Sequence, residues 1–325
     1  MKAIRKMLCM AAAIVLMMSA AQAETTAKTQ SIGYAVSAVL PANQLGDSTG
    51  YFDLLLAPQQ EQVLQVKILN REAEEIMVAV EANAAFTNQH GVIAFAGEPN
   101  AERFGAVDFL EIVTVIDPLK TEGLAGEYAP EQPLTNAGEM AEAIHTAEGN
   151  GDTVVLKVPA MGETVAEFAV TAPEEPFAGA VFGGLVFTRL DQAQADDAGG
   201  MAIRNIYRYA IGVRLQMSQE TVLPDFSLAG ASLTQTGTQT LTLRLNNLQP
   251  LIAHNITLRG AIVSAQGESL YEFERGNISM APNTAMDYEV ILDGLTLPES
   301  DPYSVSMTLE YAGMVWQFQQ PIHIV

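Results

Sequence analysis

Cysteine is almost missing from this sequence. Cys9 is the only one among 325 residues, and it lies in an N-terminal segment that we expect to be removed during export. The exported chain would then contain neither a disulfide nor a thiolate site, so its stability must come from buried apolar area. About 300 residues are enough for two domains with cores of ordinary size.

The first 23 residues are typical of a secretory signal peptide. Three basic residues among the first six precede an apolar stretch, residues 7–18, which is too short to cross a bilayer, and the cleavage motif Ala21-Gln22-Ala23 follows. The mature chain is therefore predicted to begin at Glu24. A lipoprotein interpretation would use Cys9, but this residue stands near the start of the apolar stretch and not after it.

Basic residues are also scarce. The chain has 16 Lys and Arg against 38 Asp and Glu, and three of the basic residues lie in the predicted signal peptide, which leaves a mature net charge of 13 − 38 = −25. Such a chain repels phosphates, which argues against nucleic acid and anionic lipid surfaces as partners.

Long apolar runs are missing after the signal peptide. No later run reaches the roughly 18 to 20 residues of a membrane span, and the C-terminal sequence WQFQQPIHIV contains no sorting motif or basic tail. We therefore expect a secreted protein without a transmembrane anchor in this chain, associated with the cell wall or cell surface through non-covalent contacts.

What the sequence does contain is alternation of apolar and polar residues with a period of two, which predicts strands with one buried face. In residues 62–70 the inward set is Leu64, Val66 and Ile68, and in residues 75–82 it is Ile76, Val78 and Val80. Similar alternation runs through residues 205–215 and on to Trp316 and Phe318. The pattern predicts an all-β chain of two tandem immunoglobulin-like antiparallel β-sandwiches, residues 24–190 and 205–325, joined by a linker at 191–204.

Alternation fades between residues 98 and 151. This acidic region has one helical spacing, from Met140 to Ile144, and is interpreted as a solvated insertion in the first sandwich that carries a short helix. The part from about residue 117 onward is the least strand-like.

Motifs for catalysis are lacking throughout. The sequence contains no G-x-S-x-G, H-E-x-x-H, phosphate-binding or dinucleotide-binding pattern. Its four histidines, His90, His145, His254 and His323, have no ligand-like spacing, and a pair of catalytic carboxylates cannot be selected from 38 acidic residues. The sequence therefore predicts no catalytic residues, no cofactor and no metal site.

Three further groups of residues have a functional and a structural interpretation. Oxygen ligands from Asp191, Asp196 and Asp197 would suit calcium, but their spacing is not that of an EF-hand and a solvated linker is favoured. Asn255 and Asn277 begin glycosylation sequons, which matter only in a host with that pathway. The rings of Tyr207, Tyr209 and Trp316 would suit a sugar platform, although their place in alternating strands favours core packing.

The order of eight short segments resembles that of the WxL-interacting proteins of Gram-positive bacteria. These segments are VLPANQ (39–44), YFDLLLAPQQEQVLQVKILN (51–70), GVIAF (91–95), FAGAVFGGLVF (177–187), NIYRYAIGV (205–213), LNNLQP (245–250), MAPNT (280–284) and the late Trp316. The resemblance covers nearly the whole mature chain. It implies a DUF916-like peptidoglycan-binding domain followed by a DUF3324-like host-binding domain.

The function implied by the resemblance is attachment. The first domain would bind peptidoglycan, and the second would bind a host extracellular-matrix protein or a WxL-domain partner protein. Members usually continue into a transmembrane helix with a basic tail, whereas this chain stops at Val325. Two other classes stay open: a strand-donating, chaperone-like sandwich, which needs an exposed strand edge, and a cell-wall hydrolase, which needs a cleft with converging carboxylates.

Overall fold

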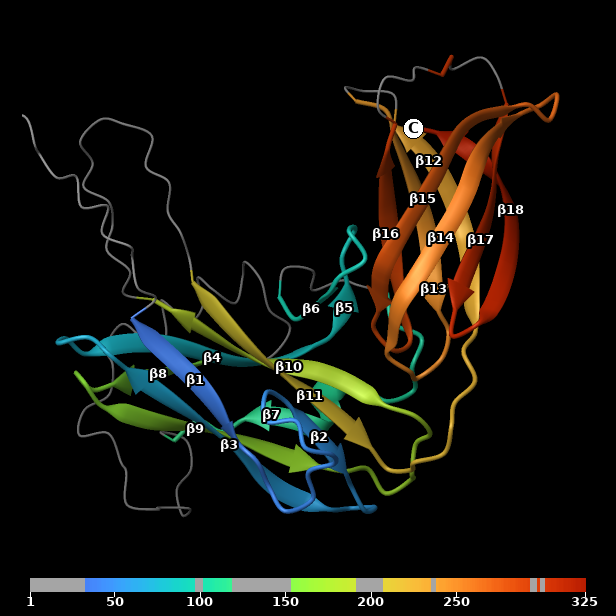
Figure 1. The fold of residues 1–325 in the computed structure, drawn as a ribbon. Coiled ribbons are helices and arrows are strands. Elements are labelled where there is room, and N and C mark those ends of the chain that lie inside the picture. The colour runs from blue at the N-terminus through green and yellow to red at the C-terminus, as the bar shows by residue number, and fades with distance from the viewer. Residues whose placement is uncertain are drawn as a thin grey trace, which may run out of the picture. The chain divides into compact units, whose positions relative to one another are not determined.

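Two β-sandwiches contain most of the residues that the computed structural model describes, which are 33–96, 102–118, 153–190, 207–234, 238–292, 297–298 and 302–325 (Figure 1). The predicted all-β fold is therefore confirmed. The predicted signal peptide, His145, the helical spacing from Met140 to Ile144 and the three aspartates at 191–197 lie outside the described residues.

The first sandwich consists of two sheets. Sheet A has the order β1 (Tyr34–Val39), β3 (Glu61–Asn70), β9 (Glu163–Thr171) and β7 (Val113–Val115). Sheet B has the order β2 (Phe52–Leu55), β11 (Arg208–Gln216), β10 (Val181–Arg189), β4 (Ile76–Ala84) and β8 (Thr153–Val158). All neighbouring strands are antiparallel except β2 and β11, which run parallel.

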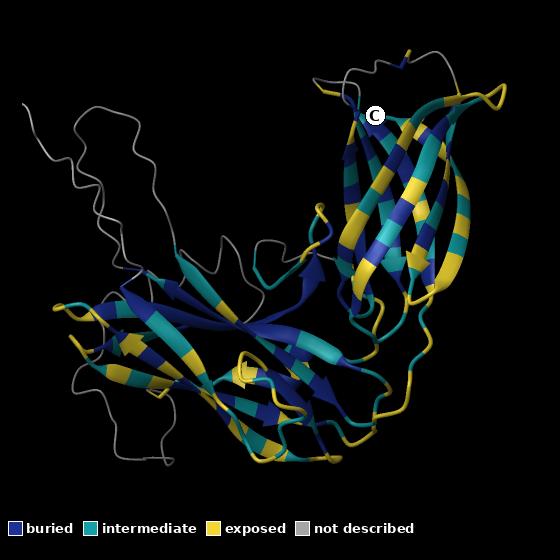
Figure 2. Cartoon of the chain, viewed as in Figure 1, coloured by how far each residue is buried: buried dark blue, intermediate teal, exposed yellow. Residues whose placement is uncertain are grey.

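The core of this sandwich follows the predicted alternation. Both predicted inward sets, Leu64 with its partners in β3 and Ile76 with its partners in β4, have no exposed surface. Between the sheets, the rings of Phe168 and Phe187 meet edge to face at 6.2 Å. Figure 2 shows buried and exposed positions alternating along the strands, as a half-buried sheet requires.

Residues 102–118 are more ordered than the interpretation of 98–151 as a solvated insertion suggests. They contain the short helix α2 (Phe109–Ile112), capped by the Asp108 side chain, which accepts a hydrogen bond from the N–H of Leu110 at 2.9 Å, and then strand β7. Phe109 is 2% exposed. The segment thus contributes to the core of the first sandwich. The sequence did not indicate this, because one large buried side chain and a strand of three residues leave no extended alternating pattern.

Strand β11 corrects the expected start of the second sandwich. Residues 205–213 were expected to open that sandwich, but β11 pairs with β10 from Val181↔Leu215 to Thr188↔Arg208 and lies in sheet B. In chain order, residues 191–204 therefore lie between two strands of the first sandwich, and the second begins with β12 (Phe226–Thr234). Alternation indicates which face of a strand is buried but not which sheet contains the strand. Strand β11 pairs with the edge of β10 that β4 leaves open, so that β10 is paired on both sides.

The second sandwich has seven strands in the order β15 (Ser269–Met280), β14 (Ala253–Ser264), β17 (Tyr303–Tyr311), β18 (Met314–Ile324), β12 (Phe226–Thr234), β13 (Thr240–Asn247) and β16 (Thr284–Ile291). Strand β18 joins the two halves: its first part pairs with β17, and residues 322–324 pair with β12 in parallel. The core contains the alternating residues predicted for these strands, among them Leu243, Leu258 and Val305, which have no exposed surface.

A small hairpin of the first sandwich contacts the second within the compact unit Tyr34–Val325. It consists of β5 (Phe86–Thr87) and β6 (Ile93–Ala94). The Thr87 hydroxyl accepts a hydrogen bond from the N–H of Ala281 at 2.9 Å, and the carbonyl of Gly91 accepts one from Ser279 at 2.8 Å. A β-carbon at Gly91 would lie 2.7 Å from the Ile278 side chain, so only glycine allows this approach.

A candidate binding surface on the first sandwich

Two adjacent glycines in β10 let aromatic rings approach both faces of sheet B. A β-carbon at Gly183 would lie 2.3 Å from the ring of Phe109 on the core side. A β-carbon at Gly184 would lie 2.5 Å from the ring of Phe95 on the outer side. Because neither ring could remain beside a larger residue, the glycine pair explains how the outer face of β10 becomes an aromatic surface.

Strand register extends this surface sideways. Gly184 lies between Gly212 of β11 and Asn83 of β4, so that two residues without side chains are adjacent. The ring of Phe182 lies 3.4 Å, and the Cβ of Tyr51 3.7 Å, from the position of a β-carbon at Gly212. Phe95 and Phe182 meet edge to face at 5.4 Å. We call Tyr51, Phe95 and Phe182 the aromatic cluster.

A polar network borders the aromatic cluster on the β2 side. Arg214 lies beside Phe182 in register and donates from Nη1 to Asp53 Oδ2 at 3.3 Å. Gln216 donates to the other oxygen of Asp53 at 3.0 Å and accepts from Arg214 Nη2 at 3.1 Å. The Nε of Arg214 is buried and has no partner among the described residues. The network holds the guanidinium beside the rings.

A second polar pair borders the cluster on the β8 side. Glu81 and Asn83 are 3% and 4% exposed. Glu81 accepts from the Thr153 hydroxyl at 2.9 Å and from Asn83 Nδ2 at 3.4 Å. No described cation contacts this carboxylate, and the Oδ1 of Asn83 has no described partner. Buried polar atoms without partners are uncommon in folded proteins, but side chains this buried do not contribute to the accessible surface.

The combination of these groups determines which ligands the surface suits. Aromatic rings pack against the apolar C–H faces of sugars, while an accessible guanidinium donates hydrogen bonds to their hydroxyl and acetamido groups. Tyr51 is 38% exposed and the Arg214 side chain is also 38% exposed, so both are accessible. The surface therefore fits a neutral carbohydrate better than an anionic polymer.

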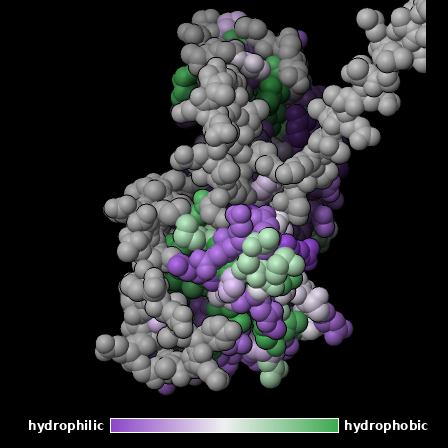
Figure 3. All heavy atoms as spheres, turned by 90° about the vertical axis from the view of Figure 1, so that its left-hand side faces the viewer, coloured by the Kyte–Doolittle hydropathy of each residue, from purple (hydrophilic) through white to green (hydrophobic). Residues whose placement is uncertain are grey.

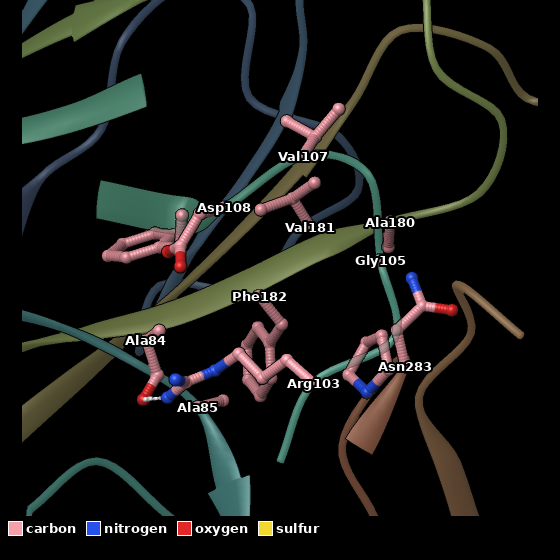
Figure 4. Close-up of a pocket in the computed structure, with 12 residues that line it drawn as sticks. Ala84, Ala85, Arg103, Gly105, Val107, Asp108, Ala180, Val181, Phe182 and Asn283 are labelled. Carbon is pink, nitrogen blue, oxygen red and sulfur yellow. Dashed lines mark hydrogen bonds between the residues drawn. The ribbon is translucent and has the colours of Figure 1, made fainter. Parts of the chain in front are cut away.

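A small pocket lies next to this surface (Figure 4). Its lining includes Arg103, Asp108, Phe182 and Asn283, and its volume is about 50 Å³. Arg103 donates to the carbonyl of Ala84 at 3.4 Å, and its buried Nε has no described partner. Pockets for small organic ligands usually measure about 300–1,000 Å³, so this one holds a few water molecules at most.

The outer face of sheet A is a second, flatter surface. Val39, Val63, Leu69 and Val165 are between 37% and 48% exposed there, and Gln65 donates to Glu167 at 2.8 Å beside them. No aromatic side chain accompanies them on the described strands of this face. Hydrophilic and hydrophobic residues also lie side by side on the face of the molecule drawn in Figure 3.

Two of the three aromatic residues expected to pack in cores, Tyr209 and Trp316, are half-buried and pack against another ring. Tyr209 meets Tyr34 edge to face at 5.0 Å, and its hydroxyl donates to the carbonyl of Tyr34 at 3.2 Å. Trp316 meets Phe226 edge to face at 5.0 Å in the second sandwich. Because Tyr209 and Trp316 belong to different sandwiches, they form no common sugar platform with Tyr207.

The histidines and the sequon asparagines show no site chemistry. His90, His254 and His323 lie in separate elements, and the described residues contain no group of three or more His, Cys, Asp or Glu that could hold a metal. Asn255 and Asn277 have φ of 60° and 58° near register shifts between β14 and β15. Asparagine tolerates this left-handed conformation better than most residues, which accounts for its presence there.

Comparison with known proteins gives two domain matches. Residues 34–189 match the family model described as WxL Interacting Protein, peptidoglycan binding domain, and residues 198–325 match that described as WxL Interacting Protein, host binding domain. The second match begins before β11, although β11 pairs within sheet B. A search of curated proteins found no match.

Several solved structures share a low similarity with the chain. The YadV chaperone is 10% identical with a TM-score of 0.30, over 89% of this chain and 100% of that one. The E. coli chaperone DraB is 12% identical with a TM-score of 0.29, over 89% of this chain and 97% of that one. These TM-scores carry no argument about fold or function. In the described part of the chain, no helix is long and apolar enough to cross a membrane.

Proposed function

Because the chain belongs to the WxL-interacting protein family, we propose that it is a non-enzymatic adhesin or scaffold subunit at the bacterial cell surface. Its first domain binds peptidoglycan, its second binds a host matrix protein, and the chain also binds a WxL-domain partner. The observation that carries this proposal is the pair of domain matches, whose descriptions both name binding and not catalysis. The small size of the pocket next to sheet B agrees with recognition on open surfaces.

The aromatic cluster and its polar borders are the peptidoglycan contact in this proposal. The glycan strand of peptidoglycan carries hydroxyl and acetamido groups on sugar rings, which match the accessible guanidinium of Arg214 beside Tyr51 and Phe182. A chain with a net charge of −22 cannot be attracted to anionic wall polymers by its overall charge. Binding must therefore depend on neutral contacts or on bridging divalent cations.

Pull-down of the mature chain on purified peptidoglycan tests the proposal. We expect binding that changes little as the salt concentration rises, because stacking and neutral hydrogen bonds are not screened. Tyr51→Ala should weaken binding about tenfold, since it removes the most exposed ring of the cluster. Val63→Ala on the outer face of sheet A is the matched control, with a side chain 48% exposed.

Three outcomes would count against this function. Steep loss of binding with salt would refute the neutral contact, and equal loss in Tyr51→Ala and Val63→Ala would refute the location. Clearing of glycan in a zymogram by the mature chain would show a hydrolase. No observation of the described residues favours that activity.

A further inference from the structure

Among the described strands, β1 has a neighbour on one side only, so its other edge is free of strand pairing. The N–H of Asn70 bonds the carbonyl of Gly162 on the β9 side, so the even-numbered residues of β3 point toward β9 and the odd-numbered ones toward β1. The residues of β1 whose backbone groups bond to β3 are therefore those opposite its odd-numbered residues, namely Ala35, Ser37 and Val39. The backbone groups of Tyr34, Val36 and Ala38 point away from the sheet.

Only the first of these three outward residues has a hydrogen-bond partner. The carbonyl of Tyr34 accepts from the Tyr209 hydroxyl at 3.2 Å. The N–H and C=O groups of Val36 and Ala38 have no partner among the described residues. Both residues are half-buried, so the edge offers four backbone groups beside partly covered apolar side chains.

Three other edge strands of the described chain have hydrogen bonds on their outer sides. The edge of β2 is met by Leu45, whose N–H bonds the Asp53 carbonyl at 2.6 Å. The edge of β16 is met by the carbonyls of Glu102 and Gln89, each 3.1 Å from a β16 N–H. On β8, the Thr164 hydroxyl bonds the Lys157 carbonyl at 2.9 Å. Covered edges protect a sheet from pairing with other chains.

Strand β1 also lacks the features that discourage pairing. Its sequence, YAVSAV, contains no charged residue, no proline and no glycine, and its register with β3 is continuous over six residues. Strand β15, by contrast, carries three charged residues and pairs with β14 through several register shifts. An uncharged, regular edge with unpaired backbone groups is the arrangement to which an extended segment of another chain adds as a new strand.

We propose that β1 is the docking edge for an extended segment of the WxL-domain partner protein, which adds to sheet A as a fifth strand. The identity of the partner rests on the proposed function, whereas the edge itself does not. The two domain descriptions name peptidoglycan and host ligands, and neither assigns the WxL contact that names the family. The segment is uncharged or basic, with apolar residues at alternate positions beside Val36 and Ala38.

A second copy of this chain is a poorer occupant of the same edge. Each chain has a net charge of −22 before removal of any signal peptide, so two copies repel one another at low salt. The proposal therefore predicts a hetero-complex and not a homodimer.

Proline substitutions can block the outward edge of β1 without breaking its pairing with β3. Ala38→Pro and Val36→Pro each remove an N–H that points away from the sheet, which edge strands tolerate. Ser37→Pro removes an N–H that faces β3, and is the control for damage to the sheet. The measurement is binding of the full mature chain to purified, immobilised WxL-domain protein, with the unfolding midpoint of each variant recorded alongside.

The expected result is that wild type binds, and that Ala38→Pro and Val36→Pro bind at least about tenfold more weakly, with unfolding midpoints near that of wild type. Ser37→Pro should instead lower the midpoint. Wild-type binding that both outward variants retain would overturn the β1 assignment and leave the proposed function intact. If the wild-type chain does not bind the WxL-domain protein, then that protein is not its partner and does not occupy the β1 edge. Wild-type dimerisation in sedimentation that Ala38→Pro abolishes would assign the edge to a second copy and overturn the proposal.

Discussion

The two adjacent glycines of β10 should respond very differently to alanine. Gly183→Ala places a β-carbon 2.3 Å from two atoms of the Phe109 ring, which is 2% exposed and has no space to move into. Overpacking of a core costs about 1–3 kcal/mol, and an approach this close belongs at the upper end. Replacing glycine gains about 0.4–1 kcal/mol through the unfolded state. We therefore expect a net loss of about 2 kcal/mol.

Gly184→Ala places its β-carbon 2.5 Å from the ring of Phe95. Phe95 is only half-buried, so its ring can move toward solvent. The variant then loses the edge-to-face contact with Phe182, which is worth about 0.5–1.5 kcal/mol, and gains about 0.4–1 kcal/mol through the unfolded state. The net change in the free energy of unfolding should lie within about 1 kcal/mol of zero, but the outward movement of the ring should disturb the aromatic cluster.

Equilibrium unfolding in urea, followed by far-ultraviolet circular dichroism, measures both changes. Gly230→Ala in β12 is the matched control, because a β-carbon there would meet nothing within 4 Å; it should be neutral or stabilise by about 0.4–1 kcal/mol. If Gly183→Ala is no more destabilising than Gly184→Ala, the assignment of the two glycines to opposite faces of sheet B is refuted.

Three further predictions concern polar contacts. Arg189 donates to both oxygens of Glu72 at 2.7 and 2.8 Å and lowers the pKa of that carboxyl below its usual 4.5. The ion pair's contribution to stability is therefore complete above pH 4.5 and disappears as the pH falls through the folded pKa. In unfolding measured across acid pH, Glu72→Gln should cost about 1 kcal/mol at pH 7 and little near pH 2. Asn247→Ala leaves two carbonyls, 2.8 and 2.9 Å from its buried Nδ2, without that donor, and should cost about 1–3 kcal/mol in urea. Glu102→Gln breaks a partly exposed ion pair with Arg244. The free energy of unfolding should therefore fall by less than about 1 kcal/mol, and this difference should vanish in 1 M salt. A difference that does not depend on salt would contradict this prediction.

The candidate site was only partly accessible to sequence analysis. The segment FGGLVF was recognisable as a family-like apolar run, yet nothing in it shows that Gly183 and Gly184 accommodate rings from opposite sides. Tyr51 and Asn83 carry no motif, and they are separated by 32 positions in the chain. The useful signals were glycines inside alternating strands, which often mark a close approach of another group.

The free edge of β1 was likewise invisible in the sequence, because an edge is defined by the absence of a neighbour. Residues 34–39 resemble any short strand with one buried face. Only the register with β3 shows that Val36 and Ala38 point away from the sheet. The hydrogen bonds that cover β2 and β16 come from residues outside regular strands, and no local pattern predicts them.

The sequence by itself determined the strand content, the inward-facing residues and the two-sandwich fold class, because alternation and burial are local properties of a strand. It also carried the family resemblance that the domain matches confirm. Tertiary structure alone decided that β11 pairs with β10, that Gly212, Gly184 and Asn83 share one row, and that β1 keeps a free edge. Strand pairing depends on which edges remain unpaired after all the strands have assembled, and this is a property of the whole chain.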